Sequence, residues 1–295
     1  MMELRLLEYF LAVAREQSIN KAAESLHMTQ PSLSRQMQEL EKELGRQLFI
    51  RSSRKITLTE EGMIFRKRAE EMLDLIEKAK TEVLSASVDL SGEIFIGSGE
   101  TRGISALAGL LHSFSAEYPH VKYHLYSGNA EDICDRLDRG LLDFGLIIGQ
   151  ADVGKYQVLP LPGKDRWGLL LRRDHPLAGK EAVRAEDLPG LPLLLSRQMQ
   201  HNQELRHWFG RNWDQLEGIA TYNLLYNASL LAEAGVGCVL CLENIIPEYP
   251  GSLLRFLPLD PPAEASCCLI WKKSQVFSRP AKKLLERLKE SFSHD

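Results

Sequence analysis

Apolar residues near the start of the chain recur at helical spacing, and residues 18–37 predict two short helices around a tight turn. Asn20 is the candidate N-cap of the first helix, and small apolar residues line that helix: Ala22, Ala23 and Leu26. In the second helix Thr29 or Gln30 can act as the cap, and Pro31 suits the first turn, where no N–H is needed. Four apolar residues of this helix are expected to face a core: Leu33, Met37, Leu40 and Leu44.

The other faces of the second helix carry polar side chains that suit the major groove of DNA. The polar candidates are Gln30, Ser32, Ser34, Arg35 and Gln36, and Pro31 in the first turn is a further candidate contact. Arginine can bridge O6 and N7 of guanine, glutamine can do the same with N6 and N7 of adenine, and serine bonds bases or phosphates. The pattern therefore favours a DNA-binding helix-turn-helix. An ordinary helical hairpin with a solvated polar face is the alternative that two helices alone leave open.

A short basic hairpin is predicted directly after these helices. Residues 47–51 and 55–58 alternate like strands, and between Leu44 and Glu60 there are basic side chains but no acidic ones. The candidate contacts to DNA phosphates are Arg51, Arg54 and Lys55. Acidic and basic residues nearly balance over residues 1–90, so phosphate contacts would have to be concentrated in this wing and the recognition helix. A solvated charged loop is the competing interpretation.

One long helix is predicted from the cap Thr59 to about Ser85. Its apolar residues recur at alternating spacings of four and three, which is a heptad pattern: Phe65, Ala69, Met72, Ile76, Ala79 and Val83. A helix of this length is longer than one small domain can cover, so the pattern favours a linker through which two copies of the chain dimerise. Packing of the same stripe on its own winged domain is the alternative.

The first 62 residues resemble a LysR-type bacterial transcriptional regulator. The resemblance is carried by residues 2–10, by residues 20–26, by residues 29–36, by Leu40-Glu41-Lys42-Glu43-Leu44-Gly45-Arg46-Gln47-Leu48-Phe49-Ile50-Arg51 and by Leu58-Thr59-Glu60-Glu61-Gly62. It implies double-stranded promoter or operator DNA as a partner, a homodimer through the linker helix, usually assembled as a dimer of dimers, and a small-molecule effector. The resulting plan is a winged helix-turn-helix domain at 1–58, a linker helix at 59–90 and an effector-binding domain at 91–295.

Beyond residue 90 strands and helices alternate, which predicts an α/β domain with parallel sheets. Strands are expected at 93–97, 121–126, 142–148, 167–171, 193–195, 238–242 and 267–271, and helices at 104–114, 133–139, 203–209, 229–234 and from Pro280 onward. The order predicts one lobe from 91–161 and 266–295 and a second lobe from 162–265. This two-lobed domain resembles periplasmic binding proteins, although Leu242-Glu243-Asn244 stand where the LysR family frequently has a glycine-rich strand followed by proline.

Polar residues follow the carboxyl ends of the expected strands, where α/β sheets bind ligands. The candidate effector contacts are Ser98, Glu100, Thr101, Ser127, Asn129, Ile148, Ser196 and Asn227. Hydroxyls, amides and helix N-termini suit a small polar molecule. The carboxylate of Glu100 would repel an anion and favour an amine, a hydroxyl or a neutral group. Each of these residues also has an ordinary role as a cap or turn former.

The five cysteines allow a redox alternative. Cys238 and Cys241 have the spacing of a redox pair, but in a strand this spacing places the side chains on opposite faces, which opposes a disulfide. No second Cys/His pair has the spacing of zinc ligands, so neither a metal nor another cofactor is predicted.

The composition limits the remaining classes. The chain has 295 residues, is 44% hydrophobic and carries a net charge of −4, as expected for a globular protein of two or three domains. The sequence shows neither a signal peptide nor a membrane-spanning run, so a cytoplasmic location is expected. A solute-binding protein would share the two lobes but should carry an export signal and no helix-turn-helix. An enzyme is disfavoured because no phosphate loop, nucleophile elbow or paired-histidine motif is present.

Overall fold

The computed structural model describes residues 3–51, 55–84, 90–197, 199 and 202–292. The chain divides into two compact units, residues 1–83 and 84–295. None of the described helices is both long enough and apolar enough to cross a membrane.

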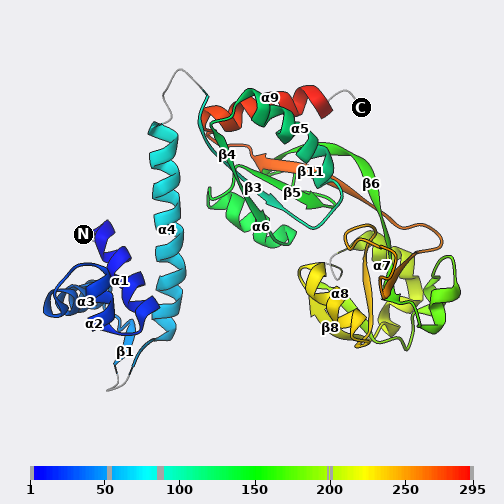
Figure 1. Cartoon of the computed structure of the whole chain (residues 1–295), viewed down its shortest axis with the longest axis horizontal. Coiled ribbons are helices and arrows are strands. Elements are labelled where there is room, and N and C mark those ends of the chain that lie inside the picture. Colours follow the sequence, from blue (N-terminus) through cyan, green and yellow to red (C-terminus); the bar gives the residue numbers. More distant parts are fainter. Residues whose placement is uncertain (1–2, 52–54, 85–89, 198, 200–201, 293–295) are drawn as a thin grey trace. The chain divides into compact units, whose positions relative to one another are not determined.

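The first unit is a small helical domain with a two-stranded hairpin (Figure 1). Its elements are α1 (Leu4–Glu16), α2 (Ile19–Ser25), α3 (Gln30–Leu44), β1 (Phe49–Arg51), β2 (Ile56–Leu58) and α4 (Glu60–Leu84). Its core joins residues from all three short helices, from the start of the hairpin and from α4: Leu7, Phe10, Val13, Ala22, Ala23, Leu33, Met37, Leu40, Leu48, Phe49 and Ala69. Helices α2 and α3 are therefore the predicted helix-turn-helix, and β1 and β2 are the predicted wing.

Two local predictions in this unit were wrong. Ser18, and not Asn20, is the N-cap of α2, and its side chain accepts a hydrogen bond from the backbone N–H of Lys21. Asn20 lies inside the helix because the chain already becomes helical at Ile19. Leu44, expected in the core, is 38% exposed because it is the last residue of α3, where Gly45 turns the chain away in the left-handed conformation.

Helix α4 does not present its apolar residues as one continuous seam. Phe65 and Ala69 pack into the core of the winged domain, and the rings of Phe10 and Phe65 meet edge to face at 4.9 Å. Met72 and Ala79 are exposed instead, and Ile76 is half-buried. The alternative interpretation therefore applies to the first part of the stripe, while the side chain of Val83 lies outside the described residues. The prediction that Thr59 caps this helix is confirmed, because its Oγ1 accepts a hydrogen bond from the N–H of Gly62 at 2.9 Å.

Lobe I of the second unit is a five-stranded sheet in the order β4-β3-β5-β11-β6. Its elements are β3 (Gly92–Ser98), α5 (Ile104–Glu117), β4 (Val121–Ser127), α6 (Ala130–Asp138), β5 (Phe144–Ile148), the first part of β6 (Tyr156–Arg172), β11 (Glu264–Lys272) and α9 (Arg279–Phe292). Helices α5 and α9 cover one face of the sheet and α6 covers the other (Figure 1). β3 pairs in parallel with β4 and β5, as the alternation of strands and helices predicts.

Lobe II continues from the second part of β6, which pairs with β9, and the order runs on through β7 to β8. Its elements are β7 (Leu193–Ser196), α7 (Gln203–Phe209), β8 (Gly218–Tyr222), α8 (Leu225–Glu233), β9 (Cys238–Leu242) and β10 (Leu254–Pro258), with short 3-10 helices at Pro176–Gly179, Ala185–Asp187 and Gly210–Gln215. One core lies against α7 and a second against α8. β8 and β10 were not predicted, and α8 begins earlier than expected.

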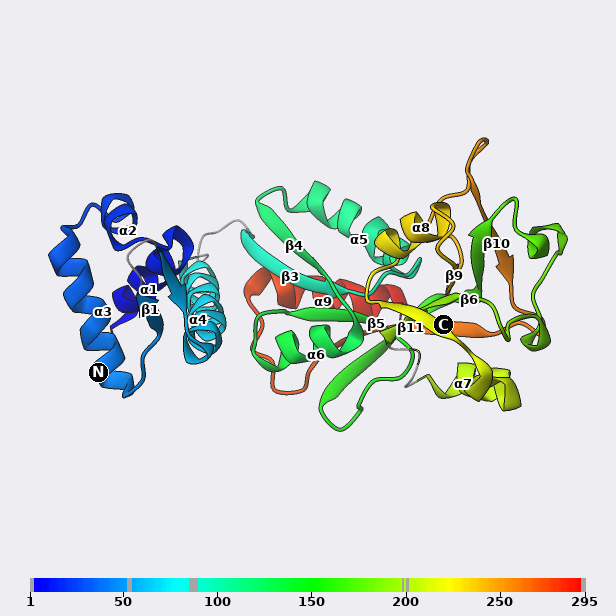
Figure 2. The ribbon, with the colours of Figure 1, turned by 90° about the horizontal axis from the view of Figure 1, so that it is seen from below.

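Two strands run from one lobe into the other, β6 and β11 (Figure 2). Residues 156–166 of β6 pair antiparallel with β11, and the register shifts between Ser266 and Cys268. The sequence predicted that the chain crosses between lobes twice, near residues 161 and 265. The predicted strand at 167–171 is only the second part of β6, which already begins at Tyr156.

Candidate functional site

The N-terminal turn of α3 presents most of the predicted groove-reading residues to solvent. Gln30, Pro31, Ser32 and Arg35 are exposed, and Ser34 and Gln36 are half-buried. Leu33 and Met37, which alternate with them along the helix, are fully buried, so the core fixes which face points outward. The structure thus brings these six residues together in the first two turns of one helix, four of them exposed.

Arg35 and Gln36 share one acidic partner that the sequence analysis did not identify. Arg35 Nε donates to Glu39 Oε1 at 2.9 Å, and Gln36 Nε2 donates to Glu39 Oε2 at 3.4 Å. The Arg35 side chain is 78% exposed and that of Glu39 is 51% exposed, so this is a solvated pair. A groove contact by Arg35 has to compete with Glu39. The i,i+4 spacing of the two residues is the sequence signal that could have identified this pair.

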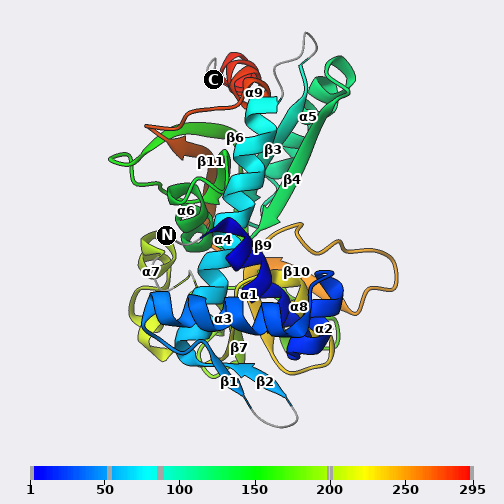
Figure 3. The ribbon, with the colours of Figure 1, turned by 90° about the vertical axis from the view of Figure 1, so that its left-hand side faces the viewer.

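The wing is attached to the recognition helix by Glu41. Its Oε1 accepts hydrogen bonds from the backbone N–H groups of Leu48 at 2.8 Å and Phe49 at 3.1 Å. Its Oε2 lies 3.2 Å from Arg51 Nη2. The hairpin extends away from the helices (Figure 3). Arg51, predicted to contact phosphate, is therefore also a structural partner of Glu41. Lys55 is exposed, and Arg54 lies outside the described residues.

In lobe I the carboxyl ends of β3 and β4 lie side by side. Ser98 pairs in register with Ser127, and the Gly128 N–H donates to the Ser98 carbonyl at 3.1 Å. Ser127 is exposed. Asn129 caps α6 by accepting a hydrogen bond from the Asp132 N–H at 2.9 Å. Asn129 thus has the ordinary capping role that was weighed against ligand binding.

The loop after β3 connects the two lobes. The carboxylate of Glu100 accepts a hydrogen bond from the backbone N–H of Leu225, the first residue of α8 in lobe II. The hydroxyl of Thr101, the next residue, donates to Asp165 Oδ2, and Cys267 Sγ lies 2.8 Å from Thr101 Oγ1. Leu225, Asp165 and Cys267 were not predicted as site residues. Their contacts span 64 to 166 positions along the chain, so no local pattern reveals them.

The remaining effector candidates have different surroundings. Ile148, at the end of β5, packs against the core of lobe I and the core of lobe II. Ser196 ends β7 and is paired in register with Tyr222 of β8. Asn227 is exposed on α8, two positions after Leu225. Burial is the main cause that raises the pKa of Tyr222, and the negative charge of Glu100 raises it further. Glu100 is therefore close enough to the β8 edge of lobe II to act on it electrostatically.

Cys238 and Cys241 point to opposite faces of β9. Cys238 belongs to the core beside α7, and Cys241 belongs to the core beside α8. Burial raises the pKa of the Cys238 thiol to about 11 and that of Cys241 further above its usual range. The predicted geometry is confirmed. Thiols in these surroundings stay protonated and react slowly with oxidants, so the redox alternative gains no support from the structure.

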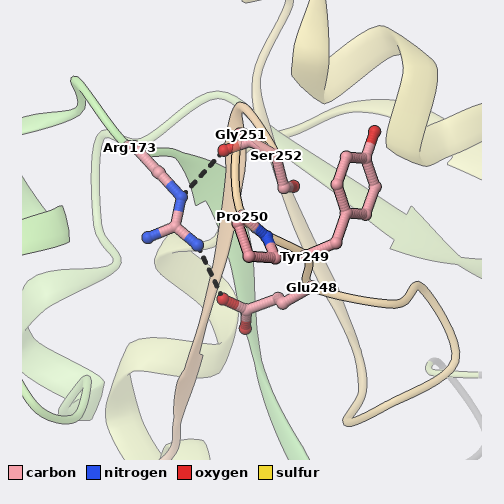
Figure 4. A pocket seen from close by; sticks show the side chains of 6 residues that line it. All are labelled: Arg173, Glu248, Tyr249, Pro250, Gly251 and Ser252. Atoms are coloured by element: carbon pink, nitrogen blue, oxygen red, sulfur yellow. Dashed lines mark hydrogen bonds and ion pairs between the residues drawn. The ribbon is translucent and has the colours of Figure 1, made fainter.

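One cavity of lobe II lies away from the predicted effector residues. It has a volume of about 480 Å³ and is lined by Arg173, Glu248, Tyr249, Pro250, Gly251 and Ser252 of lobe II (Figure 4). The Arg173 guanidinium is already engaged, because Nε donates to the Ser252 carbonyl at 2.8 Å and Nη2 lies 3.2 Å from Glu248. This hollow therefore offers a ligand few unpaired polar groups. Among the described residues no cluster of histidine, cysteine and carboxylate side chains has the arrangement of a metal site.

An exposed recognition helix with a basic wing, joined in one chain to a two-lobed α/β domain, defines the class of ligand-responsive DNA-binding regulators. Comparison with known proteins agrees. The family model described as "LysR substrate binding domain" matches residues 88–293, and the model "Bacterial regulatory helix-turn-helix protein, lysR family" matches residues 4–63. The chain belongs to the LysR family of bacterial transcriptional regulators.

Individual relatives show the extent of the similarity. The chain is 28% identical to the HTH-type transcriptional regulator BsdA of Bacillus subtilis (strain 168) over 299 residues, which covers 97% of this chain and 99% of BsdA. It is 33% identical to the uncharacterized HTH-type transcriptional regulator YybE of the same organism over 194 residues, 66% of each chain. The crystal structure of CbnR, a LysR family transcriptional regulator, superposes with a TM-score of 0.78 at 21% identity and covers 99% of both chains. The likeness to CbnR shows the fold of the whole chain.

Proposed function

We propose that this protein regulates transcription by reading operator DNA with α3 and the wing, under the control of a small molecule bound between the lobes of its second unit. Gln30, Pro31, Ser34 and Arg35 would read base edges in the major groove, assisted by Ser32 and Gln36. Arg51, Arg54 and Lys55 would contact phosphates. The protein would act in the cytoplasm, where DNA is accessible, as a binding protein and not as an enzyme.

The observation that carries this proposal is the fixed relation between the recognition helix and the wing. Glu41, on α3, bonds the backbone of Leu48 and Phe49 where the hairpin begins. A rigid helix and a rigid hairpin hold base-reading and phosphate-binding groups in one register, which sequence-specific binding requires. A solute-binding protein would have no use for this arrangement.

Self-association through α4 is part of the proposal. A helix of 25 residues projects well beyond the small domain that Phe65 and Ala69 pack against. Met72 is 37% exposed and Leu75 is 44% exposed on the same helix. An apolar surface of this kind is covered when two copies pair, and pairing sets two recognition helices at a fixed spacing on a two-fold site.

Control by a ligand would use the contacts between the lobes. The two lobes share β6 and β11, and Ile148 packs on both cores. A small molecule that changes how the lobes meet would change the spacing of the winged domains in the oligomer. This is an allosteric coupling between two distinct sites.

The decisive test of the function is a mobility-shift titration on the promoter beside the protein's own gene, repeated at several defined salt concentrations, with Arg35→Ala and Lys55→Ala variants. Loss of a bidentate base contact costs about 1–3 kcal/mol, so Arg35→Ala should weaken specific binding by about fivefold to somewhat more than a hundredfold and relax selectivity. Lys55→Ala should weaken binding to all sequences and lower the salt dependence by about one unit of slope. Arg15→Ala in α1 removes an exposed arginine of the same domain and serves as the control. Wild-type affinity and selectivity in Arg35→Ala would refute the groove assignment.

A further inference from the structure

Helix α8 begins without a cap from its own neighbourhood. The N-cap residue is Leu224, whose extended backbone leads into the helix but whose apolar side chain cannot accept a hydrogen bond. The first N–H groups of any helix have no partner within that helix. At Leu225, which is buried, this N–H is bonded to the carboxylate of Glu100 from the other lobe. Glu100 therefore does for α8 what an aspartate or serine cap does elsewhere, but across the boundary between the lobes.

The loop that carries Glu100 is fixed to both strands that cross between the lobes. Thr101 donates its hydroxyl proton to Asp165 of β6, and the Arg102 N–H donates to the same oxygen at 3.3 Å. Cys267 of β11 lies 2.8 Å from Thr101 Oγ1 and 3.9 Å from Asp165 Oδ2. Asp165 is only 5% exposed, so these neutral donors are its means of satisfying a buried carboxylate. The anchored loop positions the carboxylate of Glu100 at the end of α8.

The charge of Glu100 matches the place it occupies. The N-terminus of a helix carries a partial positive charge and favours an anion. A second small anion at the same N–H would lie within a few ångströms of Glu100 and would be repelled by it. The N-terminus of α8 is therefore a place that favours a negatively charged oxygen, and the Glu100 carboxylate already occupies it.

We propose that Glu100 is a built-in carboxylate that links the lobes in the absence of an effector and determines which ligands the interlobe site accepts. A small carboxylate binds at the end of α8 only when Glu100 is removed or displaced. The inference concerns the site that the proposed function assigns to the effector and rests on that assignment, but its test does not depend on DNA binding.

Hydrogen exchange of the full-length protein, read by mass spectrometry on a peptide that contains Leu225, tests the link directly. Glu100→Ala should accelerate exchange at this peptide by about tenfold or more, since the Leu225 N–H loses its acceptor. Sodium acetate should restore protection in Glu100→Ala and leave the wild type unchanged, with sodium chloride of equal ionic strength as the reference. Glu181→Ala, which removes an exposed carboxylate of lobe II, should exchange at this peptide like the wild type.

Each result decides a part of the inference. Unchanged exchange in Glu100→Ala would show that no such link exists in solution. Faster exchange that acetate does not reverse would make Glu100 a cap and remove its role in ligand choice. Protection of the wild type by acetate would contradict exclusion of anions by Glu100.

All four tryptophans, Trp167, Trp208, Trp213 and Trp271, lie in the second unit, so their fluorescence during unfolding verifies that each variant is folded. Glu100→Leu, which keeps the bulk of the side chain but has no hydrogen-bond acceptor, replaces Glu100→Ala if the latter does not fold. Absence of any effector control over DNA binding would refute the proposed function and leave the exchange results standing.

Discussion

The Glu41 carboxylate accepts a hydrogen bond at 2.8 Å from the backbone N–H of Leu48, a residue with only 2% of its surface exposed. A buried N–H without an acceptor costs about 1–3 kcal/mol, so Glu41→Ala should destabilise the winged domain by an amount of this order. Urea unfolding followed by far-UV circular dichroism measures the change. The DNA affinity should fall as well, because the wing loses its attachment to α3.

Glu24→Ala is the matched control for this prediction, since it removes an exposed glutamate from α2 in the same domain. It should leave the unfolding midpoint within experimental error of the wild type. Equal stability of Glu41→Ala and Glu24→Ala would mean that the hydrogen bonds from Leu48 and Phe49 contribute nothing measurable.

Glu39 is predicted to reduce the affinity for DNA. It holds Arg35 Nε at 2.9 Å, and this contact must break before Arg35 can reach a base. Exposed ion pairs contribute at most about 1 kcal/mol, so Glu39→Gln should strengthen binding by up to about fivefold in a mobility-shift titration. Glu24→Gln makes the same change of net charge elsewhere in the domain. An equal gain in both variants would show that the effect is general electrostatics and not release of Arg35.

Much of the first unit was predictable because its signals are local. Helical spacing identified Leu33, Met37 and Leu40 as core, and all three are fully buried. The N-cap of α2 was misassigned because Ser18 and Asn20 are both good caps, and spacing alone does not decide between them. The division of the α4 stripe also depends on tertiary packing, since the heptad pattern does not reveal that Phe65 meets Phe10 of α1.

In the second unit the alternation of strands and helices was predictable, but the bounds of the strands and the contacts between distant residues were less so. Only the second part of β6 was predicted, and its first part includes Pro160, a residue type that disfavours strands, which nevertheless pairs in register with Cys268 of β11. The positions of Glu100 and Thr101 after β3 followed from the rule for α/β sheets. Their partners did not, because Leu225 lies 125 positions from Glu100 and only the folded lobes bring them together.

Dimerisation through α4 predicts a specific effect of Leu75, which is 44% exposed. Burial of a leucine side chain between two copies stabilises the dimer by about 1.5–3 kcal/mol, and a glutamate at this position removes that contribution. Leu75→Glu should therefore weaken the dimer by about ten- to a hundredfold. Sedimentation equilibrium measures the dissociation constant. Lys67→Glu also creates a glutamate at an exposed position of α4 and should leave association nearly unchanged. An unaltered dimer in Leu75→Glu would place the interface on another surface.

The buried thiol of Cys238 predicts how stability depends on pH. Burial raises its pKa from the ordinary value of 9.0 to about 11, so the folded protein keeps a proton that the unfolded chain releases. The contribution of this thiol to stability is complete below pH 9.0 and decreases as the pH rises towards about 11. Cys268, whose pKa is also raised to about 11 by burial, adds to the same decrease. Tryptophan fluorescence during urea unfolding should show Cys238→Ala with a shallower loss of unfolding free energy over this range. Val239→Ala, at the next position of β9, is the control and should be less stable at every pH, with the same slope of unfolding free energy against pH as the wild type. An unchanged slope in Cys238→Ala would show that this thiol titrates alike in the folded and unfolded chain.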